Sequence, residues 1–378
     1  MYHVRLPAKQ EGWRNALHRP QKTGSGGSPP NPVGNDCAPR ARGLKQRRST
    51  FPLLFALGAA IATNALGGVD LQILIPLYSY PSWYQPSSYI WDDVGRAGSR
   101  VPITAVINPD NGPGPGFPNS DYSHGMADLA SAGVKMVGYV YTSYGTRDLA
   151  TVKWDIDQYT NSPLVTGIFL DEAASATNQL AYYQDLYAYI HARTNFMTVI
   201  LNPGTQTTPE YLTQSAADAA VIFESGTGWR EYVPDPYVSS LPANRFAALA
   251  YDCGSAETMR TNVDLAVHRN IGWVYVTTGN LPNPWEALPP YWDNFVDYVK
   301  AYRELRATSI TATNGNLSIT FSAIPNRPAH VEWAPNLPST NWTPATGTLV
   351  PTGTVLTVLA DTNCAAAKRF YRLRLSPP

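Results

Sequence analysis

The chain has 378 residues, 44% hydrophobic and 11% aromatic with only 15% charged, a composition that excludes a disordered protein and argues against a nucleic-acid binder. Its formal net charge is zero, but ten of its 28 basic residues and only two of its 28 acidic residues precede residue 66. The rest of the chain therefore carries a charge of about −8, which does not attract polyanions.

The first expected element is a leader over residues 1–65. It combines a basic segment, an apolar stretch of about 15 residues at 51–65 and small residues at Thr63 and Ala65, as in a signal peptide cleaved after Ala65. Because the segment before residue 44 is rich in Pro, Gly and Arg, we expect translation to begin downstream of it. No apolar run reaches the ~20 residues of a membrane-spanning helix. We therefore expect a protein that is secreted, periplasmic or held at the cell surface and that leaves the membrane after cleavage.

Residues 66–306 alternate apolar, β-branched runs with segments of helical period, the pattern of successive βα units. The expected strands are Gln72–Tyr78, Ile103–Asn108, Lys135–Tyr141, Thr166–Asp171, Met197–Asn202, Ala219–Glu224, Arg245–Tyr251 and Gly272–Thr277. The expected helices include Tyr122–Ala132, Arg147–Gln158, Asn178–Arg193, Ala256–Arg269 and Tyr291–Leu305. Eight units over about 235 residues are typical of a closed (β/α)8 TIM barrel. The alternative is an open doubly wound sheet, although no Gly-rich phosphate loop follows the first strand.

Residues 309–378 have a different character, with short alternating runs separated by Pro, Gly and Asn. They predict a small all-β, sandwich-like accessory module. Its last strand is expected at Arg369–Leu375, with Arg372 on one face and Leu373 on the other. Trp333 and Trp342 are either sugar-stacking residues or core positions of this module.

Three carboxylates mark the candidate active site. The run "GIFLDE" ends in Asp171 and Glu172, and the run "AAVIFE" ends in Glu224. In a barrel these ends lie at the catalytic face, and strands four and six place their acids across a cleft from each other. A carboxyl pair across a glycosidic bond is what glycoside hydrolysis needs.

Each acid also has a purely structural interpretation. Asp171 and Glu172 could complement the N-terminus of a helix beginning near Ser175. Glu224 could form an ion pair with Arg230 or another base at the barrel mouth. The appearance of acids in the same register on two strands favours the catalytic interpretation.

Polar and aromatic residues around the same mouth are candidates for substrate binding. Asn108 and Asn202 each stand before a Pro at a strand end, where they either bind a sugar or simply form a turn. Aromatic side chains with apolar faces suit pyranose rings, and we expect about half of them to line the cleft. They are Tyr78, Tyr80, Trp83, Tyr139, Tyr141, Tyr144, Trp229, Tyr251 and Trp285.

Other kinds of site find no support in the sequence. No His residue has a partner at metal-ligand spacing, and no Gly-x-Ser-x-Gly elbow follows a strand, so neither a metal nor another cofactor is expected. Cys253 and Cys364 either pair in an oxidising compartment or remain free. We expect a monomer whose partner is a polysaccharide, with no nucleic acid involved.

The order of the motifs resembles the spherulin-4 (spherulation-specific) family. The resemblance rests on "ILIPLYSYP", "INPDNGPG", "VGYVYTSYGTR", "GIFLDEA", "VILNPGT", "VIFES" and "PNPWEALPPYWDNF", between residue 72 and about 300. It implies a glycoside hydrolase-like barrel, similar to secreted endo-α-1,4-N-acetylgalactosaminidases that cut galactosaminogalactan-type polysaccharides. The family's acidic residues fall on Asp171, Glu172 and Glu224. The β module lies outside the resemblance.

Two mechanisms fit these acids. In a retaining endo-glycosidase, Asp171 would be the nucleophile and Glu224 the general acid/base, with Glu172 in support. In a substrate-assisted hexosaminidase, Asp171 would orient a 2-acetamido group while Glu172 protonates the leaving oxygen. A carbohydrate-binding protein without catalysis is the contrasting class.

Overall fold

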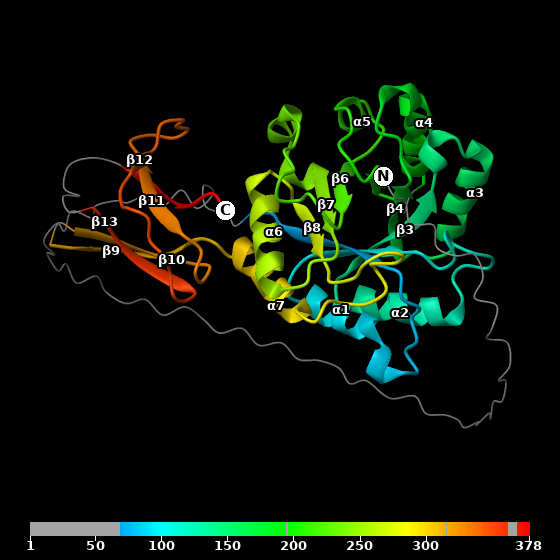
Figure 1. The fold of residues 1–378 in the computed structure, drawn as a ribbon, viewed down its shortest axis with the longest axis horizontal. Coiled ribbons are helices and arrows are strands. Elements are labelled where there is room, and N and C mark those ends of the chain that lie inside the picture. Colours follow the sequence, from blue (N-terminus) through cyan, green and yellow to red (C-terminus); the bar gives the residue numbers. More distant parts are fainter. Residues whose placement is uncertain (1–68, 194–195, 315, 362–368) are drawn as a thin grey trace, which may run out of the picture. The chain divides into compact units, whose positions relative to one another are not determined.

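Eight parallel strands close into a barrel (Figure 1). The computed structural model describes residues 69–193, 196–314, 316–361 and 369–378, so the expected leader and Cys364 lie outside the described residues. The strands are β1 (Gln72–Leu77), β2 (Ile103–Ile107), β3 (Lys135–Tyr141), β4 (Val165–Asp171), β5 (Thr198–Leu201), β6 (Ala219–Ser225), β7 (Phe246–Ala250) and β8 (Trp273–Val276). Hydrogen bonding from β8 back to β1 closes the ring. The predicted barrel is confirmed, and the open sheet is excluded.

Helices surround the strands, as Figure 1 shows. They are α1 (Ile90–Gly98), α2 (Ser120–Ser131), α3 (Leu149–Tyr159), α4 (Leu180–His191), α5 (Glu210–Thr213), α6 (Ala256–His268) and α7 (Trp292–Arg303). Five short 3-10 segments lie in the loops, at Pro86–Ser88, Ser143–Gly145, Thr177–Gln179, Pro236–Ser240 and Ala243–Arg245. The sequence did not single out α1 and α5. The single-turn α5 is too short to show a helical period.

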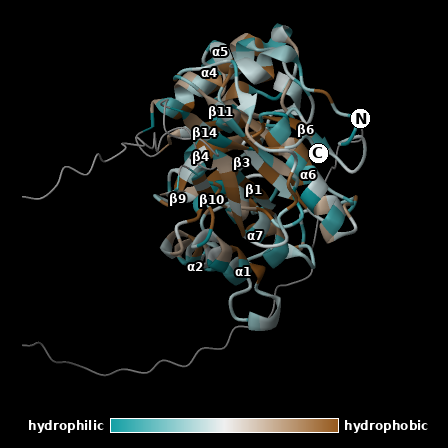
Figure 2. Ribbon diagram, turned by 90° about the vertical axis from the view of Figure 1, so that its left-hand side faces the viewer, coloured by the Kyte–Doolittle hydropathy of each residue, from teal (hydrophilic) through white to brown (hydrophobic). Residues whose placement is uncertain are grey.

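The strands form where they do because both of their faces are buried. In β1, β2 and β4 nearly every residue is inaccessible to solvent, as expected of strands enclosed by helices. Figure 2 shows brown, hydrophobic strands at the centre of the barrel and much teal on its exterior. Within the described residues, no helix is long and apolar enough to cross a membrane.

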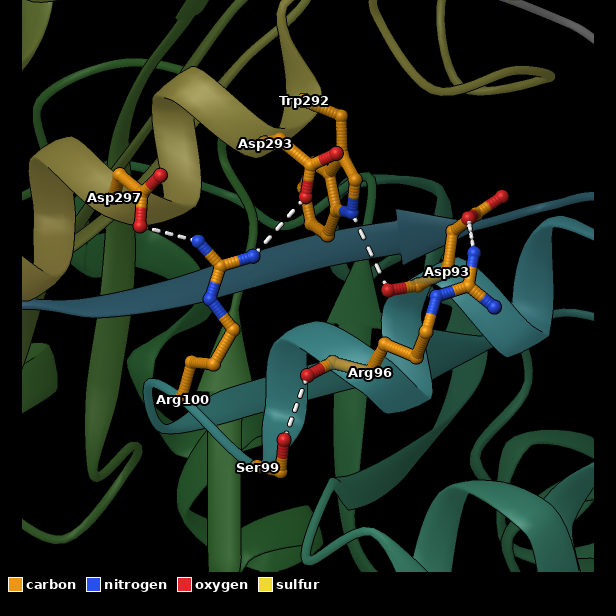
Figure 3. Close-up of polar contacts among 7 residues, drawn as sticks. All are labelled: Asp93, Arg96, Ser99, Arg100, Trp292, Asp293 and Asp297. Atoms are coloured by element: carbon orange, nitrogen blue, oxygen red, sulfur yellow. Dashed lines mark hydrogen bonds and ion pairs between the residues drawn. The ribbon is translucent and has the colours of Figure 1, made fainter.

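Polar contacts join the first and last helices of the barrel, α1 and α7 (Figure 3). Arg100, just after α1, forms ion pairs with Asp293 and Asp297 on α7. The indole of Trp292 also donates to the carbonyl oxygen of Asp93 in α1, at 3.4 Å. These contacts join segments almost 200 residues apart and hold the two ends of the ring together.

The C-terminal strands form two three-stranded antiparallel sheets. They are β9 (Ala307–Thr313), β10 (Asn316–Ser322), β11 (Ala329–Ala334), β12 (Thr343–Pro344), β13 (Val355–Asp361) and β14 (Phe370–Leu375). Alternate residues of β10, namely Leu317, Ile319 and Phe321, are buried in a core separate from that of the barrel. The predicted all-β class of this region is confirmed.

Two arginines cover the tryptophans of this region. The guanidinium of Arg369 lies 4.3 Å from the ring centre of Trp333, and that of Arg372 lies 4.2 Å from Trp342. A face occupied by a guanidinium is not open to a sugar. Neither tryptophan belongs to the buried core of this region and both are partly exposed, so the core interpretation and the sugar-stacking interpretation both stay predictions.

Candidate active site

A cavity of about 750 Å³ opens where the barrel strands end. Seven strands supply side chains to it, either from the strand or from the residue directly after it: Pro76, Tyr78, Asn108, Tyr139, Phe169, Asp171, Asn202, Glu224, Leu249 and Tyr251. Pairs such as Phe169 and Asp171 face the cavity together because side chains two apart in a strand point the same way. The cavity thus lies at the end of the barrel where TIM-barrel enzymes keep their active sites.

One amide nitrogen connects two of the predicted acids. The Nδ2 of Asn202 donates to Asp171 Oδ1 at 2.7 Å and to Glu224 Oε2 at 2.6 Å. The amide cannot be turned around, because its Oδ1 accepts from the backbone N–H of Gly204. Each carboxyl group therefore receives one of the two amide hydrogens, and both are held at a common point.

The order of the strands explains why Asn202 occupies this position. β5 lies between β4 and β6 in the barrel. The backbone of Asn202 bonds on the β4 side to Leu170 and Ala173, and Gly204 accepts from the N–H of Glu224 on the β6 side. The segment after β5 is therefore fixed to both acid-bearing strands. Its first side chain falls between the two acids.

The other oxygen of Asp171 is bound by Tyr139. The hydroxyl of Tyr139 donates to Asp171 Oδ2 at 2.8 Å, so both oxygens of this carboxyl group have a donor. Tyr78 packs edge-on against Tyr139, with ring centres 5.7 Å apart. Sequence reasoning named Tyr139 only as an aromatic surface, because nothing in the sequence indicates which acid its hydroxyl reaches.

The two bridged acids have perturbed protonation. Burial, with a further contribution from the charge of Asp171, raises the pKa of Glu224 to about 7. Burial also raises the pKa of Asp171, but the hydrogen bonds from Tyr139, Asn202 and the backbone oppose this effect. Because Asp171 has more donors, Glu224 is the group that holds the proton near neutral pH. The difference in donors favours Glu224 as the member of the pair that keeps a proton and Asp171 as the member that ionises first.

Glu172 adopts a backbone conformation that non-glycine residues rarely take. Its φ is +46°, and Ser143 and Tyr144, in the loop after β3, also have positive φ. The two loops are joined, since the N–H of Tyr144 and the hydroxyl of Thr142 both donate to the carbonyl oxygen of Glu172. Such strain is characteristic of functional sites. The strained turn puts Glu172 in the cavity wall beside Asp171.

Asn108 carries a polar group that the described residues leave unsatisfied. Its side chain is 7% exposed and lines the cavity. The Oδ1 accepts from the N–H of Gly112 at 2.9 Å, which fixes the amide orientation, while no partner among the described residues bonds Nδ2. An unsatisfied buried donor costs ~1–3 kcal/mol. Asn108 therefore lies at the cavity wall with its Nδ2 buried and unpaired within the described part of the chain.

The predicted binding residues divide into two groups. Tyr78, Asn108, Asn202, Tyr251 and Trp285 line the cavity, whereas Tyr80, Tyr141, Tyr144 and Trp229 are not among its lining residues. Trp229 is buried behind β6, and its indole donates to Asn262. Arg147 lies over the ring of Tyr141, 3.9 Å from its centre. Tyr80 and Tyr144 stand in loops, where strand alternation no longer determines direction.

The structural interpretations of the acids find no support. Within the described residues, neither Asp171 nor Glu224 has an ion-pair partner. No acidic residue lies in the first turn of α4, the helix that follows β4.

Cys253 is a buried free thiol that contacts Asn262. In the described ranges, no group of three or more His, Cys, Asp or Glu residues is arranged to hold a metal ion.

Comparisons with known proteins identify relatives of the barrel. A family model described as spherulation-specific family 4 matches residues 72–299, which contain all eight barrel strands. Spherulin-4 of Physarum polycephalum is 35% identical over 226 residues, covering 57% of this chain and 66% of that protein, just under two thirds of its length. The crystal structure of Aspergillus clavatus Sph3 in complex with GalNAc matches with a TM-score of 0.54 and 27% identity, over 62% of this chain and 99% of the other.

Proposed function

Because the chain belongs to the spherulation-specific family 4, we propose that it is an endo-acting glycoside hydrolase. Its proposed substrate is a galactosamine- or N-acetylgalactosamine-containing polysaccharide, which it cleaves at internal glycosidic bonds. Its likeness to Sph3 supports a carbohydrate-active enzyme or binder on a glycoside hydrolase-like barrel. The GalNAc in the Sph3 crystal supports an amino sugar as the substrate unit. The observation that carries the catalytic proposal is the shared donor Asn202, which holds Asp171 and Glu224 together.

The short connection between the acids supports a retaining mechanism. Two oxygens bound to one nitrogen lie no further apart than the two hydrogen bonds placed end to end. This limit agrees with the ~5–5.5 Å of retaining glycosidases and is short of the ~6.5–9.5 Å that inverting enzymes need for a water molecule. A water-mediated inversion between Asp171 and Glu224 is therefore disfavoured.

The proposed reaction has two steps. Protonated Glu224 gives its proton to the glycosidic oxygen while ionised Asp171 attacks the anomeric carbon, forming a glycosyl-enzyme and releasing the first product. Glu224, now ionised, takes a proton from water as that water attacks the anomeric carbon and frees Asp171. The hydrogen bonds from Tyr139 and Asn202 keep Asp171 ionised and oriented.

The walls of the cavity support a neutral or cationic substrate. Its lining includes the carboxylates of Asp171, Glu172, Glu224 and Asp252, and none of its lining residues is Lys, Arg or His. Such walls disfavour an acidic polysaccharide and accept acetamido or ammonium groups. The leader-like residues 51–65 support an extracellular or periplasmic substrate.

A second candidate changes both the linkage and the roles. In a substrate-assisted reaction on a β-linked N-acetylhexosaminide, the acetamido oxygen lies on the face opposite the leaving group and attacks the anomeric carbon, while Asp171 orients the acetamido group and Glu172 protonates the leaving oxygen. The strained backbone of Glu172 in the cavity wall favours a specific role for this residue. The raised pKa of Glu224 favours the first scheme.

Three substitutions separate these schemes: Asp171→Asn, Glu172→Gln and Glu224→Gln. Reducing-end release is measured from a partly N-acetylated α-1,4-linked galactosamine polymer, which only the first scheme can cleave, and from a β-linked N-acetylhexosamine oligosaccharide, which the substrate-assisted scheme requires, with the exposed Glu231→Gln as the control outside the cavity. We expect Glu224→Gln to lower kcat about 10²–10⁴-fold and the control to leave it unchanged. Near-normal activity of Glu224→Gln overturns the first scheme. Binding of the polymer without release by the unmodified protein favours a non-catalytic binder.

A further inference from the structure

Three exposed aromatic residues follow β1 without lining the cavity. Tyr80, Trp83 and Tyr84, here called the aromatic platform, are 47%, 41% and 55% exposed. The other tryptophans of the barrel strands and their loops are buried, as Trp229 and Trp285 show at 5% and 6%. A group of large apolar rings left in water on one loop indicates an interaction site more often than a single exposed residue does.

The indole of Trp83 is held rigidly. Its Nε1 donates to Asp121 Oδ1 at 3.1 Å, and the second oxygen of Asp121 accepts from the hydroxyl of Tyr80 at 2.7 Å. The ring of His124 stacks on Trp83 with centres 4.4 Å apart and planes 19° from parallel. The ring of Tyr84 stands at 81° to it. The ring is therefore preorganised by α2, which carries Asp121 and His124, and keeps a large exposed area.

A purely structural role does not account for this arrangement. If Trp83 served only to hold the β1 loop against α2, burial of its ring would gain most, yet two fifths of the residue remain in water. A fixed ring with an open area lowers the entropic cost of binding a flat apolar surface. The neighbouring polar groups are the Asp121 carboxylate, the Tyr80 hydroxyl that it accepts from, and the Asn119 amide 3.5 Å from that hydroxyl, and such groups can bond hydroxyl groups of a ligand.

We propose that the aromatic platform binds a sugar unit of the same polysaccharide outside the cavity, a proposal that rests on the proposed function. The C–H face of a pyranose is flat and apolar with hydroxyl groups at its edge, and it matches an aromatic ring with polar neighbours. The β1 segment also delivers Tyr78 to the cavity wall, so both surfaces belong to one strand end. The platform is hydrogen-bonded to the carboxylate of Asp121, and no Lys or Arg side chain among the described residues bonds to it directly. These surroundings favour a neutral or cationic glycan.

The test compares Trp83→Ala with Trp154→Ala. Trp154, on α3, is 53% exposed and serves as a matched exposed tryptophan outside the platform. Affinity electrophoresis through the same galactosamine polymer, with each substitution placed in Glu224→Gln protein, measures binding without cleavage. We expect Trp83→Ala to weaken retention about five- to tenfold, Trp83→Tyr to keep most of it, and Trp154→Ala to have no effect. Thermal unfolding verifies that each variant is folded.

Activity in protein with intact Glu224 distinguishes the platform from the catalytic proposal. We expect Trp83→Ala to raise KM for the polymer about tenfold more than KM for a trisaccharide of the same linkage. If the unmodified protein cleaves the polymer and Trp83→Ala changes neither KM nor retention, the platform is wrong and the hydrolase stands. If retention depends on Trp83 but no reducing ends appear, the platform stands and the hydrolase is wrong. Equal losses in both tryptophan variants, or a change of oligomeric state in Trp83→Ala, also overturn the platform.

Discussion

At the residue scale, the central feature is the pairing of Asp171 and Glu224 through one amide. Removing Asn202 would take a donor from both acids at once and leave two partly buried carboxyl groups to repel each other. Its Oδ1 is also used, by Gly204, so no other side chain of similar size replaces the whole arrangement. Asn202 is therefore a positioning residue whose effect reaches both partners of the proposed reaction.

The protonation of Glu224 predicts how activity depends on pH. Because the proposed general acid must carry a proton and its pKa is about 7, we expect kcat/KM for the polymer to fall tenfold per pH unit well above 7. The acidic limb of the profile reports Asp171, which must be ionised. Initial rates between pH 4 and 9 measure both limbs. A rate that stays constant from pH 6 to 9 would contradict the assignment of Glu224 as the acid.

Asn108 shows how residue and setting interact. In the sequence, an Asn before a Pro has equal reason to form a turn or to bind a ligand. The structure divides the amide between two states, since Oδ1 accepts from the N–H of Gly112 in the turn, while the buried Nδ2 has no partner among the described residues. This division depends on the contacts of the folded loop and leaves no trace in the sequence.

At the scale of elements, close approach between β3 and α3 keeps Tyr139 in place. Gly138 leaves room for the ring of Tyr159, because a Cβ at position 138 would lie only 2.5 Å from Cγ of that ring. The hydroxyl of Tyr159 donates to the carbonyl oxygens of Ile107 and Tyr139. A glycine in the interior of a strand often marks such an approach. The contact fixes the strand segment from which Tyr139 reaches Asp171.

We expect Gly138→Ala to lower the free energy of unfolding by ~1–3 kcal/mol, because the added methyl group must displace the buried ring of Tyr159. Urea denaturation measures the change. Gly254→Ala is the matched control, since a Cβ at Gly254 meets no atom within 4 Å. If the two variants are equally stable, the close packing of Gly138 is not important for the fold.

At the scale of the whole molecule, the cavity acids oppose stability. A carboxyl group whose pKa is higher in the folded state binds more protons there, so the free energy of unfolding decreases as pH rises from 4.5 through about 7. The shift of Glu224 corresponds to about 3 kcal/mol above that range. A site that keeps a proton for catalysis therefore costs the barrel part of its stability at neutral pH.

Replacing this carboxyl group by an amide removes the penalty. We expect Glu224→Gln to raise the free energy of unfolding at pH 8 by up to about 3 kcal/mol relative to the unmodified protein, and by little at pH 4, where Glu224 is protonated in both states. Urea denaturation at the two pH values, with Glu231→Gln as the exposed control, tests this. An equal change at both pH values would show that the effect does not come from ionisation.

The barrel, the end of it at which the cavity opens, and the three acids that line that cavity were all predictable from the sequence. These follow from local rules, because a strand buried on both faces is a continuous apolar run, and the residue that ends it is then at the mouth of the barrel. No end of an observed barrel strand differs from the expected end by more than one residue, as β4 and β6 show. The antiparallel β region followed in the same way from the alternation of its short runs.

Only the tertiary structure decided how the acids are connected and which aromatic residues surround them. The bridge from Asn202, the hydrogen bond from Tyr139 and the free amide of Asn108 join residues more than 20 positions apart or depend on a folded loop. Distance from the strand end does not separate the aromatic residues, since Tyr78 and Tyr251, directly after their strands, and Trp285, nine residues after β8, all lie in the cavity wall. Tyr141 at the end of β3 and Trp229 in the loop after β6 do not, because contacts with Arg147 and Asn262 decide where these side chains lie.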